Sequence, residues 1–249
     1  MALLPAISTR APKEFDKDET KKETEKLRKK LEELQNLLYA ESKHAVLIIL
    51  QGLDASGKDG AIKHVFSGVN PQGISVQSFK APTAEELSHD FLWRIHPFAP
   101  AKGAIRIFNR SHYEDVLVTR VHGQCTNEMA QLRFQAINHF EQLLQNHNST
   151  LILKFYLHIS QEEQKERLNE RLENPAKKWK YNPNDFKEAA RWEQYMEAYE
   201  DVFQYCNDIP WTIVPADQNW YKEYVIIKTL TEALSSLNMQ YPLLEEKIA

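Results

Sequence analysis

The sequence predicts an α/β protein, a three-layer sandwich in which helices cover both faces of a five-stranded parallel sheet. Two observations support this fold class. Short apolar runs alternate with segments of helical spacing along the chain, and the first apolar run leads into a glycine-containing loop followed by a helix. Right-handed crossovers place every strand-to-helix loop at one edge of such a sheet. We therefore expect the functional residues at that edge.

The five strands and the helices between them are expected over defined ranges. The strands are residues 45–51, 74–79, 103–108, 151–159 and 211–214. The helices are residues 61–69, 81–96, 127–146, 160–173, 183–205 and 219–237. The first strand, AVLIILQ, is apolar and rich in β-branched residues, as expected of a strand buried on both faces.

We divide the chain into an N-terminal arm, residues 1–16, and a single domain, residues 17–249. The arm contains two prolines and lacks periodicity, which indicates a segment that lies on a neighbouring chain or is disordered. Residues 17–42 are predicted to be helical and either flank the core or form a coiled-coil seam between subunits; we favour the core. The helical prediction rests on four leucines at steps of three and four, Leu27, Leu31, Leu34 and Leu38.

The composition limits the classes of protein that the chain can belong to. A chain of 249 residues with 42% hydrophobic and 27% charged residues is ordinary for a globular protein. The net charge of −4 gives no support to binding of nucleic acid or of a membrane surface. Two cysteines far apart indicate neither a disulfide nor a zinc site, and we find no membrane-length apolar run and no signal-peptide core. We therefore expect a cytoplasmic protein.

The clearest functional signal is the loop after the first strand, Gly52-x4-Gly57-Lys58. Its glycines let backbone N–H groups point at phosphate oxygens, and the helix that follows directs the positive end of its dipole to the same place. Lys58 adds a cation, so the pattern predicts a phosphate-binding loop (P-loop) rather than a plain turn. The candidate phosphate ligands are Gly52, Ala55, Ser56, Gly57, Lys58, Asp59 and Gly60.

One position departs from the usual P-loop pattern. Asp59 stands where a serine or threonine hydroxyl normally ligates magnesium. The site must therefore coordinate its metal differently, and Asp54 inside the loop is the obvious substitute.

A polar cluster, residues 109–115, follows the third strand. Arg110 beside a phosphate loop can hold phosphate oxygens in a bidentate fork, and Glu114 and Asp115 can ligate magnesium or pair with Arg110. The alternative is a solvated turn with a surface ion pair, and the polarity directly after a buried strand favours function. We interpret His112 as a structural hydrogen-bonding residue rather than a phosphoryl acceptor, whereas Arg120 is a phosphate ligand or part of a surface salt bridge.

Residues 161–185 are predicted to form a basic lid. Arg167 and Arg171 share one helix face, and no acid interrupts residues 174–181. The lysines of this segment are Lys177, Lys178 and Lys180. A lid of this kind excludes water and neutralises a transferring phosphate, whereas the alternative is a solvated helix with ion pairs. We favour the lid.

Three motifs together resemble the signatures of the second polyphosphate kinase family: GLDASGKDG from Gly52, FNRSHYED from Phe108 and PAKKWK from Pro175. The resemblance runs from about residue 30 to 240 and implies a P-loop kinase-like fold with a helical lid, similar to nucleoside monophosphate and thymidylate kinases. It also implies reversible transfer of a terminal phosphoryl group between inorganic polyphosphate and AMP or ADP. Magnesium, or manganese in its place, is the implied cofactor. The implied partners are polyphosphate and adenine or guanine nucleotides, and we expect a homo-oligomer.

The same resemblance implies roles for individual residues. Asp54 and Glu114 would hold the metal, Lys58 would bind the transferring phosphate, and Arg110 would clamp it. Many members have aspartate at the position of Asn109, and the combination of Asn109 with Glu114 is similar to the subgroup that phosphorylates both mono- and diphosphates. The residues expected to grip the donor chain are Arg167, Arg171, Lys177, Lys178 and Lys180.

Two other functions remain to be weighed. The first is a nucleoside monophosphate kinase that uses ATP as donor, and Asp59 and the lysine-rich lid argue against it. The second is a P-loop binding module in which a nucleotide switches an interaction surface on the N-terminal helix. The crowded polar cluster at 109–115 argues against a protein without catalysis.

Overall fold

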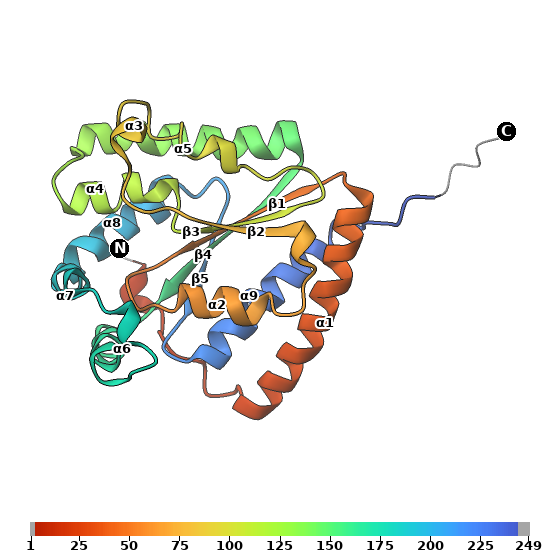
Figure 1. Ribbon diagram of the computed structural model, residues 1–249, viewed down its shortest axis with the longest axis horizontal. Helices are drawn as coiled ribbons and strands as arrows, with labels where there is room; N and C mark the ends of the chain where they lie inside the picture. Colours follow the sequence, from red (N-terminus) through yellow and green to blue (C-terminus); the bar gives the residue numbers. More distant parts are fainter. Residues whose placement is uncertain (1–2, 244–249) are drawn as a thin grey trace.

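A computed structural model describes residues 3–243, and its centre is the five-stranded parallel sheet that the sequence predicts (Figure 1). The strand order is β2-β3-β1-β4-β5, and every neighbouring pair is parallel. The carboxyl ends of all five strands therefore share one edge. The strands are β1 (Ala45–Gln51), β2 (Ile74–Ser78), β3 (Ile105–Asn109), β4 (Thr150–His158) and β5 (Trp211–Pro215).

Helices cover both faces of the sheet, as expected (Figure 1). One face carries α1 (Lys17–Glu41), α2 (Lys58–Val65) and α9 (Asn219–Ser235). The other carries α3 (Ala84–Leu87), α4 (Val118–Val121), α5 (Asn127–Asn148) and α8 (Trp192–Tyr205). The remaining two, α6 (Gln161–Glu173) and α7 (Pro183–Ala189), lie at the carboxyl edge of the strands. None of the helices within residues 3–243 is long and apolar enough to cross a membrane.

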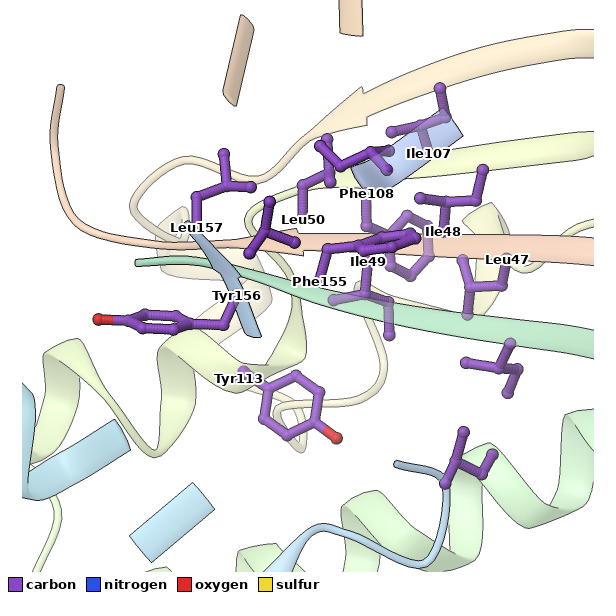
Figure 2. Packing of buried hydrophobic residues seen from close by; sticks show 14 of the residues in the cluster. Leu47, Ile48, Ile49, Leu50, Ile107, Phe108, Tyr113, Phe155, Tyr156 and Leu157 are labelled. Atoms are coloured by element: carbon purple, nitrogen blue, oxygen red, sulfur yellow. The ribbon is translucent and has the colours of Figure 1, made fainter. Parts of the chain in front are cut away.

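The core is centred on β1, whose residues are all buried. Figure 2 shows the side chains from Leu47 to Leu50 alternating between the two faces of the sheet, where Phe108 and Phe155 of the neighbouring strands pack beside them. A central strand with helices above and below has no solvated face, which explains its unbroken apolar sequence. The strand ends at Gln51, and the P-loop begins at the next residue.

The leucines of the N-terminal helix α1 pack against the core of their own chain. Leu31, Leu34 and Leu38 are buried in the main hydrophobic cluster, and α1 packs along α9. Asp16 caps the helix by accepting hydrogen bonds from the backbone N–H groups of Asp18 and Glu19. The core interpretation of the leucine pattern is therefore the one that the packing supports.

The segment before α1 differs from our expectation. We predicted that it lies on a neighbouring chain or is disordered, but its described part, residues 3–16, packs on its own chain. Leu4 is buried in the core, and the backbone N–H groups of Leu3 and Leu4 donate to the Glu200 carboxylate. Thr9 Oγ1 also donates to Asp217 at 2.7 Å. The sequence does not show these partners because they lie about two hundred residues away.

The prediction of a helix over residues 81–96 is wrong for most of that range. Thr83 does cap a helix, with a capping box to Glu86, but α3 ends at Leu87. Asp90 Oδ1 then accepts hydrogen bonds from the N–H groups of Leu92 and Trp93, and this local turn replaces further helical bonds. Two other ranges were too long: α2 ends at Val65 rather than at residue 69, and the range 183–205 is split into α7 and α8.

Candidate active site

A polar cleft of about 400 Å³ lies at the carboxyl edge of the sheet, between the P-loop and residues 161–185. We call it the loop–lid cleft. Most of the predicted site residues line it: Asp54, Ala55, Gly57, Lys58, Asp59, Gly60, Asn109, Arg110, Arg167, Arg171, Lys177 and Lys180. The fold therefore brings together three segments that are far apart in the sequence.

The P-loop has the curled backbone that its sequence predicts. Gly52 and Gly57 have φ values of +149° and +93°, which side-chain-bearing residues rarely adopt. Ala55 also has a positive φ, +63°, a conformation that is costly for a residue with a Cβ. Gly57 is the N-cap of α2, so the first turn of that helix faces the cleft.

Lys58, the first residue of α2, is folded back over the loop. Its Nζ donates to the carbonyl oxygens of Gly52 at 2.7 Å and Leu53 at 3.1 Å, and the residue is only 9% exposed. Burial and the nearby Arg110 guanidinium lower the pKa of Lys58 to about 8, despite the opposing effect of Asp54. Lys58 is thus a buried cation at the base of the cleft.

Arg110 joins the P-loop to the polar cluster after β3. It has a φ of +62°, and its guanidinium forms ion pairs with Asp54 Oδ1 and with Glu114 Oε2, the latter at 3.2 Å. The Glu114 carboxylate is the largest cause of the raised pKa of Arg110. The two predicted metal ligands are therefore brought together by one arginine. Glu114 lies in a small adjoining pocket, which Gly52 also lines.

The donor set of the cleft suits a divalent metal that substrates help to hold. Arg110 contacts one oxygen of each carboxylate, which leaves Asp54 Oδ2 and Glu114 Oε1 outside the two ion pairs. Within residues 3–243 there is no group of three or more His, Cys, Asp or Glu side chains placed to hold a metal alone. Magnesium is commonly bound by one or two carboxylates, with phosphate oxygens and waters completing the shell. The carboxylates present fit that arrangement.

Asp59 connects three elements across the mouth of the cleft. Its Oδ1 accepts a hydrogen bond from Asn109 Nδ2 at 2.8 Å, and its Oδ2 pairs with Lys180 Nζ at 3.3 Å. Burial raises the pKa of Asp59, but the Asn109 hydrogen bond and Lys180 outweigh it, so the net shift is downward. Asp59 is thus ionised and bound to the lid in this structure.

Arg167, on α6, holds the backbone of the P-loop. Its guanidinium donates to the carbonyl oxygens of Ala55 and Ser56 at 3.0 and 3.2 Å, and to those of Ala216 and Asp217 at 2.8 and 2.9 Å. These bonds tie α6 to the P-loop and to the end of β5. Arg167 Nε also pairs with Glu163 on its own helix, at 2.8 Å. The resemblance placed Arg167 among the residues that grip the donor, whereas here its two terminal nitrogens donate to backbone oxygens.

The other basic residues of the lid pair with carboxylates. Arg171 pairs with Asp185 on α7, and Lys177 pairs with Glu170, both at 2.5 Å. Lys178 is exposed and does not line the loop–lid cleft. Three cations of the lid that line the cleft, Arg171, Lys177 and Lys180, are thus held by acids of the lid or by Asp59.

Three residues of the expected or possible site lie elsewhere. Arg120 pairs with Asp201 on α8 at 2.7 Å and does not line the loop–lid cleft, so the salt-bridge alternative describes it. Asp115 is also outside the cleft, and burial raises its pKa to about 6. His112 is buried against Glu141, which agrees with a structural role.

Sequence reasoning missed several residues near the phosphate loop. Ser78, Phe79, Lys80 and Glu170 line the cleft. Ser78 ends β2, and Phe79 and Lys80 follow it at the same sheet edge, so the strand-end rule could have found them. Lys222 on α9 could not have been found, because nothing in its helical segment distinguishes it. It is 1% exposed, its Nζ lies 3.4 Å from the Gly57 carbonyl oxygen, and burial lowers its pKa to about 8.

A P-loop at the end of a central parallel strand, facing a basic lid, defines a P-loop phosphotransferase. The chain belongs to the polyphosphate kinase 2 family, whose model matches residues 14–242. This confirms the predicted family and the P-loop kinase-like α/β fold. Kinases of this family use a divalent metal ion.

Individual relatives agree with the family assignment. The chain is 49% identical over 218 residues to an AMP/ADP-polyphosphate phosphotransferase of Meiothermus ruber, covering 87% of this chain and 81% of the relative. It is 44% identical over 227 residues to an ADP-polyphosphate phosphotransferase of Rhodopseudomonas palustris, covering 86% and 78%. The crystal structure of polyphosphate kinase 2 from Arthrobacter aurescens TC1 superposes with a TM-score of 0.94 at 40% identity, covering 99% of this chain and 89% of that one.

Proposed function

We propose that the protein transfers a terminal phosphoryl group between inorganic polyphosphate and AMP or ADP, in either direction. The observation that carries this proposal is the basic lid over a P-loop, in which Arg171, Lys177 and Lys180 form ion pairs with carboxylates. A polyanionic donor can replace those carboxylates one by one. The names of the relatives from Meiothermus ruber and Rhodopseudomonas palustris support the same substrates.

In the proposed reaction, an oxygen of the acceptor's terminal phosphate bonds to the terminal phosphorus of polyphosphate. The bridging P–O bond breaks, so the donor leaves one phosphate shorter and the nucleotide gains one. Such transfers require mainly in-line positioning and neutralisation of charge. The P-loop N–H groups and Lys58 would hold the transferring phosphoryl group, and Arg110 would neutralise it while keeping Asp54 and Glu114 in place.

We assign the divalent ion as magnesium, with manganese able to replace it. Asp54 and Glu114 would hold it, and when bound it neutralises phosphate oxygens that would otherwise repel one another. Hard carboxylate oxygens and a cleft for phosphate groups support this assignment rather than a zinc site, whose usual ligands include histidine nitrogen or cysteine sulfur.

The deciding experiment measures nucleotide products with polyphosphate and magnesium. We expect ADP from AMP and ATP from ADP, and a parallel reaction with GDP tests whether guanine nucleotides are also accepted. Phosphorylation of AMP by ATP, without use of polyphosphate, would instead identify a nucleoside monophosphate kinase. No transfer with either donor would contradict the proposal. Light scattering of the same preparation tests the homo-oligomer that we expect.

A further inference from the structure

Four polar side chains form a buried network behind the polar cluster after β3. Lys154 Nζ, on β4, donates to Tyr113 Oη at 2.9 Å, to Glu141 Oε2 at 2.8 Å and to the Cys206 carbonyl oxygen at 3.0 Å. Tyr113 Oη in turn donates to Glu141 Oε1 at 2.7 Å, and His112 Nε2 lies 3.3 Å from the same oxygen. All four side chains are at most 1% exposed.

The network contains a true ion pair. Burial raises the pKa of Glu141, but its hydrogen bond with His112 and the charge of Lys154 outweigh burial, so the net shift is downward. The ammonium of Lys154 also lies over the rings of Tyr113 and Trp211, at 5.4 and 5.1 Å from their centroids. The Lys154 ammonium and both carboxylate oxygens of Glu141 therefore all have hydrogen-bond partners.

Stability alone does not explain such a pair. Removing two charges from water costs several kcal/mol per ion, and well-packed apolar residues often stabilise a core as well or better. The network is attached at one end to Tyr113 and His112, which lie in the sequence between Arg110 and Glu114. In Figure 2 the Tyr113 ring lies beneath the strands with its hydroxyl pointing away from them, which places its anchor on the α5 side of the sheet.

The segment that carries Arg110 needs such an anchor. Arg110 has a φ of +62°, an unfavourable conformation that persists only where neighbouring residues fix it. On one side its N–H donates to the Leu50 carbonyl oxygen at 3.1 Å. On the other side, Gln51 Nε2 donates to Ser111 Oγ at 3.0 Å, and the network then holds the next two residues.

We propose that Lys154 and Glu141 are positioning residues for the phosphoryl-transfer site. They hold Tyr113 and His112, and thereby set the direction of the Arg110 guanidinium and the place of Glu114. The inference rests on the proposed function, because it concerns the residues that would hold the reacting phosphates. Small displacements of such groups lower the rate of a transfer reaction more than the affinity for either substrate.

The first test compares two buried tyrosines. Tyr113→Phe removes the hydroxyl that joins Lys154 to Glu141, and we expect kcat to fall about 10- to 30-fold while the KM of each substrate changes less than about twofold. Tyr156→Phe is the matched control, because Tyr156 is equally buried but, within residues 3–243, the hydrogen bond of its Oη is a long one to Met196 Sδ, at 3.9 Å. We expect kcat of this control to stay within about twofold of the parent.

The second test separates positioning from stability. Lys154→Met combined with Glu141→Leu replaces the ion pair with apolar side chains of similar size, which removes the desolvation cost of two charges. The variant also leaves the Tyr113 hydroxyl and His112 Nε2 without Glu141, and these opposing effects should keep the thermal midpoint close to that of the parent. The kcat of this double variant should nevertheless fall about as far as that of Tyr113→Phe. In a protein that already carries Arg110→Lys, adding Tyr113→Phe should lower kcat by less than about twofold. The group that the network positions is already altered in that background.

Three results would overturn the inference. One is a folded Lys154→Met/Glu141→Leu variant with the kcat of the parent. Another is full additivity of Tyr113→Phe with Arg110→Lys, and the third is an equal loss of kcat in the Tyr156→Phe control. If the double variant does not fold, the tyrosine comparison and the additivity measurement still decide. A parent protein without polyphosphate-dependent transfer would contradict the proposed function instead.

Discussion

The two walls of the loop–lid cleft use basic side chains in different ways. On the loop wall, Lys58 donates to backbone carbonyl oxygens of the P-loop. We count Arg167 with this wall because it also donates to P-loop carbonyl oxygens, although it comes from α6 and pairs with Glu163 on that helix as well. On the lid wall, Arg171, Lys177 and Lys180 pair with side-chain carboxylates. A cation that is bound to carbonyls shapes the loop, because carbonyls remain neutral and in place. A cation that is bound to a carboxylate can exchange that anion for a phosphate.

Solvent exposure strengthens this contrast for Lys177 and Lys180, but not for the Arg171–Asp185 pair, whose side chains are 19% and 14% exposed. The Lys177–Glu170 pair is 46% exposed on both sides, and Asp59 in the pair with Lys180 is 66% exposed. Exposed ion pairs contribute about 0–1 kcal/mol, so replacing one by a phosphate contact costs little. Arg167 is only 15% exposed, and hydrogen bonds to a charged group at such sites contribute about 1.5–3 kcal/mol each. The loop wall should therefore control the rate and the lid wall the affinity for donor.

The largest expected effect is at the base of the loop wall. Lys58→Ala removes the cation that we propose binds the transferring phosphoryl group, and we expect kcat to fall about 100-fold or more, roughly 3 kcal/mol of transition-state stabilisation. Steady-state rates with ADP and polyphosphate measure the change, and circular dichroism controls for folding. Retention of most of the activity by the folded variant would remove Lys58 from the site.

The second effect tests whether Arg167 is a structural part of the loop. Arg167→Ala breaks four bonds to carbonyl oxygens, and we expect lower unfolding free energy, by about 2–3 kcal/mol, together with about a 30-fold lower kcat. Arg167→Lys should rescue little, because one ammonium lacks the planar fork that reaches both carbonyl pairs. Thermal melts and kcat are measured on the same preparations. A higher KM for polyphosphate with unchanged stability would instead make Arg167 a donor ligand.

The third effect is on the lid wall. Lys177→Ala combined with Lys180→Ala should raise the KM for polyphosphate about 10-fold and leave the KM for nucleotide and the thermal midpoint almost unchanged. Added salt should weaken donor binding less in this variant than in the parent. Lys178→Ala is the matched control, because Lys178 is exposed on the same segment but does not line the cleft. Equal effects on both substrates would make the lid a general structural element.

The sequence was sufficient for the parts of the site that are encoded locally. The apolar run of β1 followed by Gly52 and Gly57 predicts the P-loop, because strand burial and positive φ angles depend on residues next to one another. The strand-end rule predicts that residues 109–115 meet the loop, and Asn109, Arg110 and Glu114 do. The sequence thus predicted where the loop wall lies. For the lid wall it predicted the basic charge of the segment but not the partners of each cation.

The division of labour between the basic residues was not predictable. Arg167 and Arg171 stand one helical turn apart with similar neighbours, yet Arg167 meets carbonyls up to 112 residues away whereas Arg171 meets Asp185. Lys222 and Lys154 lie in segments with no motif, and their burial depends on how helices and strands pack. Local pattern gives the kind of side chain at a position, and tertiary structure decides its partner.

The smallest expected effect is a pair of opposite pH dependences at Lys58. Its pKa of about 8 means that it loses its proton above that pH, so we expect kcat/KM to fall about threefold between about pH 7.5 and about pH 8.5. Stability should change in the other direction. Because the ordinary pKa is 10.5, the unfolded chain binds more protons between about pH 8 and that value, and the unfolding free energy rises with pH there.

Lys58→Arg tests both signs at once, since a guanidinium stays charged throughout this range. The fall in kcat/KM above about pH 8 should disappear in this variant, whatever its absolute rate, and the rise in unfolding free energy should shrink. It should not vanish, because Lys222 also has a pKa of about 8 and contributes to stability in the same window. The same fall of kcat/KM in Lys58→Arg as in the parent would assign the titration to another group and leave the lowered pKa of Lys58 without a role in transfer.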